Sequence, residues 1–156
     1  MKIANDILIP ELARLIGEQK EVRFTPSGLS MRPFIEGDRD SVVMSALSCA
    51  PRQGDILLAQ VRGGSGQKTY VLHRLIRIEK GANGQTNYVL QGDGNLMGEE
   101  VCRQQDIIAR VIRIEWPGGR RKCLTRGYVW HALLPVRKWL LKIYRHTILI
   151  WYYENN

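Results

Sequence analysis

A serine held in a tight turn is the first feature of this sequence that could do chemistry. Ser30 lies in the segment S-G-L-S-M-R-P of residues 27–33, where Gly28 and Pro33 predict a turn that takes the hydroxyl out of a regular backbone hydrogen-bond ladder. A serine hydroxyl is a weak nucleophile at neutral pH and needs a base to take its proton as it attacks. If Ser30 is a nucleophile, the rest of the chain must supply that base. The alternative is a structural serine that bonds the backbone of its own turn.

The candidate base is His73, within the apolar run Y-V-L-H-R-L-I-R-I of residues 70–78. A neutral imidazole can accept the proton of Ser30 and later return it to a leaving amine. A histidine in a strand is more often a core residue than a base. Ser30 and His73 indicate nucleophilic catalysis only when they are taken together with the motif pattern around them.

Four short motifs follow one another along the chain. S-G-L-S-M-R-P is followed by G-D-I-L-L-A at residues 54–59, L-H-R-L at residues 72–75 and Q-G-D-G-N at residues 91–95. In this order they resemble the signal peptidase and LexA-type superfamily of serine peptidases, over about residues 22–114. The resemblance implies a serine endopeptidase that uses Ser30 and His73. It also implies a mostly β (α+β) catalytic domain, built as a coiled antiparallel sheet or partial barrel.

The position of His73 narrows the resemblance. Many members of the superfamily have a lysine there, and this chain is similar to the serine–histidine branch found among archaeal, endoplasmic-reticulum and some Gram-positive signal peptidases. A carboxylate that holds the second ring nitrogen improves a histidine base. The resemblance makes Asp93, in Q-G-D-G-N, the candidate for that role. The acidic pair Glu99 and Glu100 is the alternative, and Asp93 could equally hold a turn.

The resemblance also implies how an oxyanion would be bound. Ordinary signal peptidases carry a serine two residues before the nucleophile, whereas Gly28 stands there in this chain. That spacing is similar to the LexA-type branch, so we expect the backbone N–H groups of Leu29 and Ser30 to be the donors. We expect Met31 and Phe34 to bind substrate beside them, with a simple core position as the alternative for Phe34.

Periodicity predicts the elements that position these residues. Helical spacing of apolar residues predicts a short amphipathic helix at residues 5–17, packed on the catalytic domain. Short apolar stretches between turn signals predict strands at residues 22–25, 41–47, 56–61, 70–78, 88–91 and 106–114. Many short strands of this kind are typical of an antiparallel sheet.

Composition limits the class of protein. The chain has 156 residues, 44% hydrophobic and 24% charged, which suits a single globular domain. Its three cysteines show no C-x-x-C spacing, so we expect free thiols and no metal site. We expect no cofactor either.

The beginning of the chain does not read as a secretory signal, and no stretch reaches the roughly 18 apolar residues of a membrane span. We therefore expect a protein that is cytoplasmic or peripheral at a membrane.

The net charge of +8 is concentrated near the C-terminus, where residues 121–156 hold seven Lys and Arg against one Glu. We divide the chain into an N-terminal helix (residues 1–20), a catalytic domain (21–119) and a basic amphipathic tail (120–156). In the tail, Val136, Trp139, Leu140 and Ile143 share one helical stripe. The stripe fits either a helix that completes the core or an anchor at a membrane surface.

Three functions compete on the sequence alone. The first is an endopeptidase that removes a signal or leader segment from a precursor polypeptide. The second is a LexA-like regulator that cleaves itself, although the roughly 20 residues before the serine turn are too few for a helix-turn-helix domain. The third is a non-catalytic binding module of the same fold. We expect a precursor polypeptide as partner and no nucleic acid, while the oligomeric state is left open.

Overall fold

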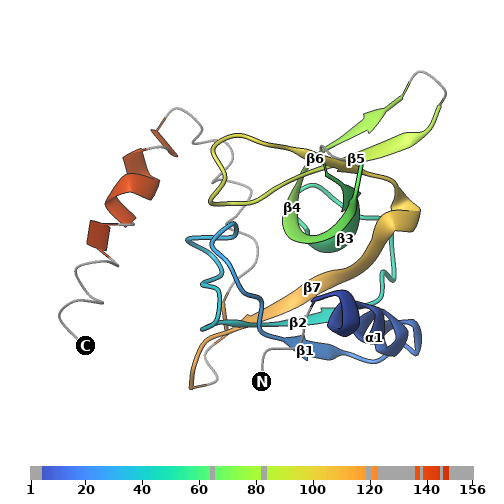
Figure 1. Cartoon of the computed structure of the whole chain (residues 1–156), viewed down its shortest axis with the longest axis horizontal. Coiled ribbons are helices and arrows are strands. Elements are labelled where there is room, and N and C mark those ends of the chain that lie inside the picture. The colour runs from blue at the N-terminus through green and yellow to red at the C-terminus, as the bar shows by residue number, and fades with distance from the viewer. Residues whose placement is uncertain are drawn as a thin grey trace.

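The computed structural model describes residues 5–63, 66–81, 84–118, 121–122, 136–137, 139–144 and 146–147. Helix α1 (Asn5–Gly17) comes first in the chain (Figure 1). It is followed by β1 (Val22–Phe24), β2 (Ser41–Ser45), β3 (Ile56–Arg62), β4 (Lys68–Lys80), β5 (Thr86–Gln91), β6 (Glu100–Cys102), the 3-10 helix η1 (Gln104–Asp106), β7 (Ile107–Glu115) and β8 (Arg121–Lys122).

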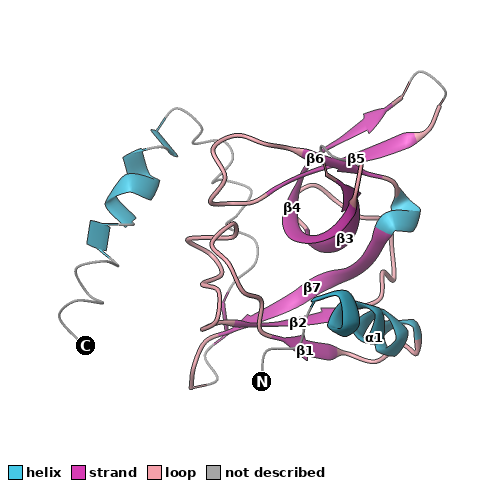
Figure 2. Cartoon of the chain, in the orientation of Figure 1, coloured by secondary structure: helices cyan, strands magenta, loops and turns pink. Residues whose placement is uncertain are grey.

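The strands form one antiparallel sheet in the order β1-β2-β7-β3-β4-β5-β6, with the two-residue β8 paired to β7. The sheet is open, and β1 and β6 are its outer strands. It also coils, because β6 contacts β3 although β4 and β5 separate them in the sheet order. Figure 2 shows the curled strands in magenta, with α1 beside β1 and β7. The expected mostly β, α+β class is confirmed.

Helix α1 has the bounds expected from the sequence. Its buried residues Ile9, Leu12 and Ile16 recur at helical spacing and join a core cluster with Met44 of β2 and Ile114 of β7. Leu8 and Leu15 pack against the same cluster. The N-terminal helix is therefore a cover on the β1–β2–β7 part of the sheet, as its amphipathic pattern predicts.

The six strands predicted from the sequence are present as β1, β2, β3, β4, β5 and β7, with ends that differ by at most two residues. The pattern does not predict β6, because its sequence E-V-C has one aliphatic residue, whereas V-R-F of the equally short β1 alternates apolar and polar side chains. The glycine-rich tips near residues 64–65 and 82–83 lie outside the described residues, as does the boundary expected at residues 119–120.

Residues 136–137, 139–144 and 146–147 are helical, and we call them the C-terminal helical segment. They lie beside the two loops that follow β1 and β5 (Figure 1). None of the helices in the described part of the chain has the length and apolar character needed to cross a membrane. Cys49 and Cys102 are free thiols, and Cys123 lies outside the described residues.

Candidate active site

The serine turn is anchored in the core by the residues that follow Ser30. Met31 is 5% exposed and Ile35 is 1% exposed, and both belong to the cluster that packs beneath α1. The backbone N–H groups of Phe34 and Ile35 each donate to the carbonyl of Met31 at 3.0 Å. Gly28 enters the turn with a φ of 97°, a conformation that favours glycine. Apolar anchors on one side and a glycine on the other hold Ser30 in a fixed loop.

The loop of residues 92–95 lies directly against this turn. The N–H of Gly94 donates to the carbonyl of Ser30 at 2.8 Å. A Cβ added at Gly92 would lie 2.4 Å from the same carbonyl oxygen, and one added at Gly94 would lie 2.7 Å from the carbonyl oxygen of Leu29. The two glycines of Q-G-D-G-N are therefore required by a backbone-to-backbone contact with the serine turn.

His73 lies on β4 and is 5% exposed. Its Nδ1 is 2.9 Å from Oε2 of Glu100 on β6. The strand register explains the contact: Glu100 pairs with Leu90 on β5, and Leu90 pairs with Leu75, two residues along β4 from His73 and on the same face. In a neutral imidazole, a carboxylate at Nδ1 favours the tautomer with its hydrogen on Nδ1, and Nε2 is then the proton acceptor.

Asp93 does not occupy the role that we expect for it. Its carboxylate accepts two hydrogen bonds from Arg74, Nε to Oδ1 at 2.8 Å and Nη2 to Oδ2 at 2.7 Å. Asp93 is 0% exposed and Arg74 is 1% exposed, so this is a fully buried bidentate ion pair. The carboxylate that holds His73 is Glu100, the alternative that the sequence leaves open. Asp93 fixes the loop of residues 92–95 to β4.

Arg74 joins the remaining motifs. Its Nη1 donates to the carbonyl of Gly54 at 2.7 Å, at the turn before β3. Its guanidinium lies 5.3 Å from the centroid of the Phe34 ring, a cation–π contact. Phe34 is therefore a support for Arg74 and does not line the pocket at Ser30, in contrast to the expected substrate contact. The sequence motifs do not by themselves indicate this central role for Arg74.

Ser30 and His73 line one pocket of about 160 Å³. Its wall comes from the serine turn and from β4, through Pro26, Ser27, Gly28, Ser30, Met31, Ile35, Gly37, Tyr70, Val71, Leu72 and His73. Within the described residues, Ser30 Oγ and His73 Nε2 have no hydrogen-bond partner. Both polar atoms are thus free to act on a molecule in the pocket. Met31 also lines the pocket, and its expected contact with substrate stays a prediction.

The expected oxyanion donors, the backbone N–H groups of Leu29 and Ser30, have no acceptor among the described residues. Leu29 is 57% exposed and is not among the residues that line the pocket, whereas Ser30 is. Two backbone N–H groups at the serine turn, with no acceptor in the described part of the chain, can together bind an anionic oxygen.

No group of three or more His, Cys, Asp or Glu side chains that could hold a metal ion occurs among the described residues. In comparisons with known proteins, no family model matches the chain, and neither does any curated protein or solved structure.

Proposed function

We propose that this chain is a serine endopeptidase with Ser30 as nucleophile, His73 as general base and Glu100 as the residue that orients His73. The observation that carries the proposal is the shared pocket. Ser30 and His73 line it from two different parts of the chain, and His73 is already held by Glu100 through Nδ1. The four motifs of the resemblance also meet there, through the contacts of Arg74, Asp93 and Gly94.

The mechanism follows from the roles of these atoms. Ser30 Oγ attacks the scissile carbonyl carbon while His73 Nε2 takes its proton. The negative charge that forms on the carbonyl oxygen is bound by the N–H groups of Leu29 and Ser30. His73 then donates its proton to the leaving amine, and the acyl group stays on Ser30. A water molecule next attacks the acyl carbonyl while His73 takes its proton, and His73 returns that proton to Ser30 Oγ as the acid product leaves. The Glu100 carboxylate stabilises the imidazolium that forms in between.

The proposed substrate is a precursor polypeptide from which a signal or leader segment is removed. The resemblance to signal peptidases suggests small residues before the cleaved bond. The exposed free thiol of Cys49 supports action in a reducing compartment, in the cytoplasm or at the cytoplasmic side of a membrane.

A library of synthetic peptides tests the proposal without a known substrate. The purified chain is incubated with peptides of varied sequence, and new termini are identified by mass spectrometry. We expect cleavage at a restricted set of bonds that follow small residues, and none with Ser30→Ala. A matched change in the same turn, Ser27→Ala, should retain cleavage. Equal cleavage by the wild type and Ser30→Ala, or products from self-cleavage alone, would contradict the proposal.

A further inference from the structure

The C-terminal helical segment docks on the body of the molecule by one face. Arg137 is 0% exposed, and its Nη2 donates to the carbonyls of Gly92 and Asp93 at 3.0 Å each. Leu141, one turn further along, is 2% exposed. One turn beyond it, the Tyr144 hydroxyl donates to Oε2 of Glu36 at 3.3 Å. Burial is the main cause that lowers the pKa of Arg137 and raises that of Tyr144.

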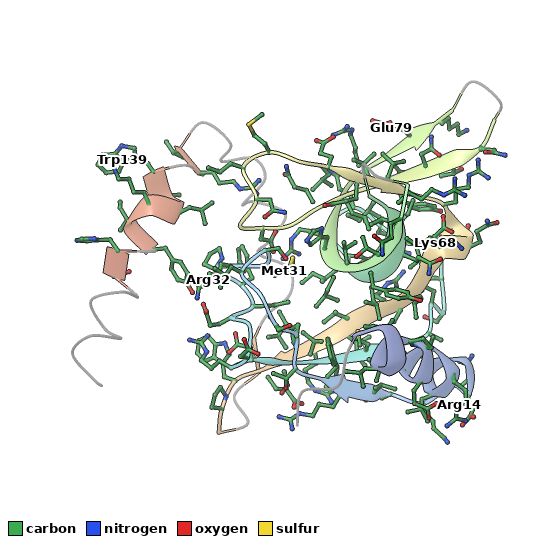
Figure 3. The ribbon with its side chains drawn as sticks, viewed as in Figure 1. Arg14, Met31, Arg32, Lys68, Glu79 and Trp139 are labelled. Atoms are coloured by element: carbon green, nitrogen blue, oxygen red, sulfur yellow. The ribbon has the colours of Figure 1, made fainter. Side chains whose placement is uncertain are left out.

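A second face of the same segment is apolar and uncovered. Val136, Trp139, Leu140 and Ile143 recur at the spacing of one helical stripe, and their exposed fractions are 49%, 72%, 38% and 46%. Figure 3 shows Trp139 on the side of the segment that faces away from the sheet. We call these four residues the outward stripe. Exposed large side chains gathered on one stripe of a docked helix mark a contact surface.

The charge around the outward stripe indicates what covers it. Lys142 and His146 are exposed on the same segment, about one and two helical turns after Trp139. The sequence of residues 136–147 holds Arg137, Lys138, Lys142 and Arg145 and no Asp or Glu, so the segment has a positive net charge, although Arg137 is buried on the docked face. A tryptophan and aliphatic side chains next to cations match the boundary of an anionic bilayer, where apolar groups enter the headgroup region and cations meet phosphates.

We propose that the outward stripe binds the surface of an anionic lipid membrane, with the C-terminal helical segment lying flat on it. The buried face of the same segment, with Arg137 and Tyr144, then connects the membrane-bound segment to the loops around Ser30. Arg137 contacts the loop of residues 92–95, and Tyr144 contacts the loop that carries Ser30. Binding through the outward stripe therefore holds the pocket of Ser30 and His73 near the lipid surface. The lipid binding does not depend on the proposed peptidase activity.

The test is vesicle co-sedimentation of the full chain carrying Ser30→Ala, so that catalysis plays no part. One set of vesicles mixes phosphatidylglycerol with phosphatidylcholine, and the other contains phosphatidylcholine alone. Trp139→Ser with Ile143→Ser removes the centre of the outward stripe, and Lys142→Glu reverses a cation beside it. The matched control is Ile78→Ser with Ile112→Ser, two exposed aliphatic residues on the sheet.

We expect binding to the anionic vesicles that is at least tenfold stronger than to the neutral ones and weakens with added salt. The Trp139→Ser, Ile143→Ser protein should lose at least tenfold in affinity, Lys142→Glu should weaken binding to anionic vesicles alone, and the control should bind as the parent does. Equal sedimentation with both vesicle types, or no loss in the stripe variant, would overturn the proposal. So would a dimer in size-exclusion chromatography that the stripe variant abolishes without any change in vesicle binding, because the occupant would then be a second copy of the chain.

Discussion

Two acidic side chains near the pocket have different roles. Glu100 is partly exposed, with 25% of its side chain accessible, and it contacts the ring of His73. Asp93 is 0% exposed, and its carboxylate forms an ion pair with Arg74. In the proposed mechanism Glu100 supports the charge that appears on His73, whereas Asp93 neutralises the buried charge of Arg74.

Glu100→Gln should lower kcat/KM by about a hundredfold or more, because the neutral amide cannot stabilise the imidazolium of His73. The matched control is Glu99→Gln, since Glu99 is the adjacent residue and pairs with exposed Arg77 instead. Steady-state kinetics on a peptide from the library screen measures both variants. Similar losses in the two variants, or none in Glu100→Gln, would show that Glu100 does not act through His73.

Asp93→Asn should destabilise the fold by about 3–5 kcal/mol, because it leaves the Arg74 guanidinium buried without its counter-charge. Glu79→Gln is the control, since its partner Arg77 is exposed and such surface pairs contribute about 1 kcal/mol or less. Denaturant unfolding followed by circular dichroism gives both values. A fully stable Asp93→Asn protein without activity would instead return Asp93 to a catalytic role.

At the scale of elements, the site depends on loops that the strands bring together. The loop after β5 supports the serine turn by contact between main chains, at Gly92 and Gly94. An added methyl group has no space there, and the serine turn would have to shift.

Gly92→Ala should lower activity by about a hundredfold, since displacing a nucleophile by about 1 Å is enough for such a loss. Gly17→Ala at the end of α1 is the control, because a Cβ at that position meets nothing within 4 Å. Activity and melting temperature are measured for both proteins. Unchanged activity in Gly92→Ala would mean that this loop does not set the position of Ser30.

The sequence predicts most of these elements but not all of their contacts. Helix α1 and six strands have clear apolar periodicity, so their positions follow from pattern alone. Strand β6, with the sequence E-V-C, lacks such periodicity, and Glu100 thus remains one of two carboxylate alternatives until the register of β4, β5 and β6 is known. The motif Q-G-D-G-N draws attention to Asp93, while its pairing with Arg74 depends on a contact across the fold that no local pattern encodes.

At the scale of the whole molecule, the C-terminal helical segment is tied to the loops of the site. The sequence predicts its apolar stripe, but the buried face is a different one and is led by Arg137. Arginine is seldom fully buried, so a pattern of apolar residues cannot find this face. Arg137 is accommodated because carbonyl groups of residues 92 and 93 accept its hydrogen bonds.

Arg137→Ala should destabilise the protein by about 1–3 kcal/mol, because the buried carbonyls lose their donor. It should also lower peptidase activity, since those carbonyls belong to the loop that supports Ser30. Val136→Ala, next to it on the exposed face, is the control and should change neither property. Melting temperature and kcat/KM are the readouts, and wild-type values for Arg137→Ala would show that docking of the segment has no bearing on the site.

The joint action of Ser30 and His73 is tested most directly by kcat/KM for the wild type, Ser30→Ala, His73→Ala and the double variant on one cleaved peptide. When a nucleophile and its base act as a unit, either change alone removes nearly all of the activity. We expect at least about a thousandfold loss in each single variant and no further loss in the double variant. More than about a tenth of the wild-type activity in either single variant, or losses that multiply in the double variant, would contradict the assignment of Ser30 and His73 as nucleophile and base.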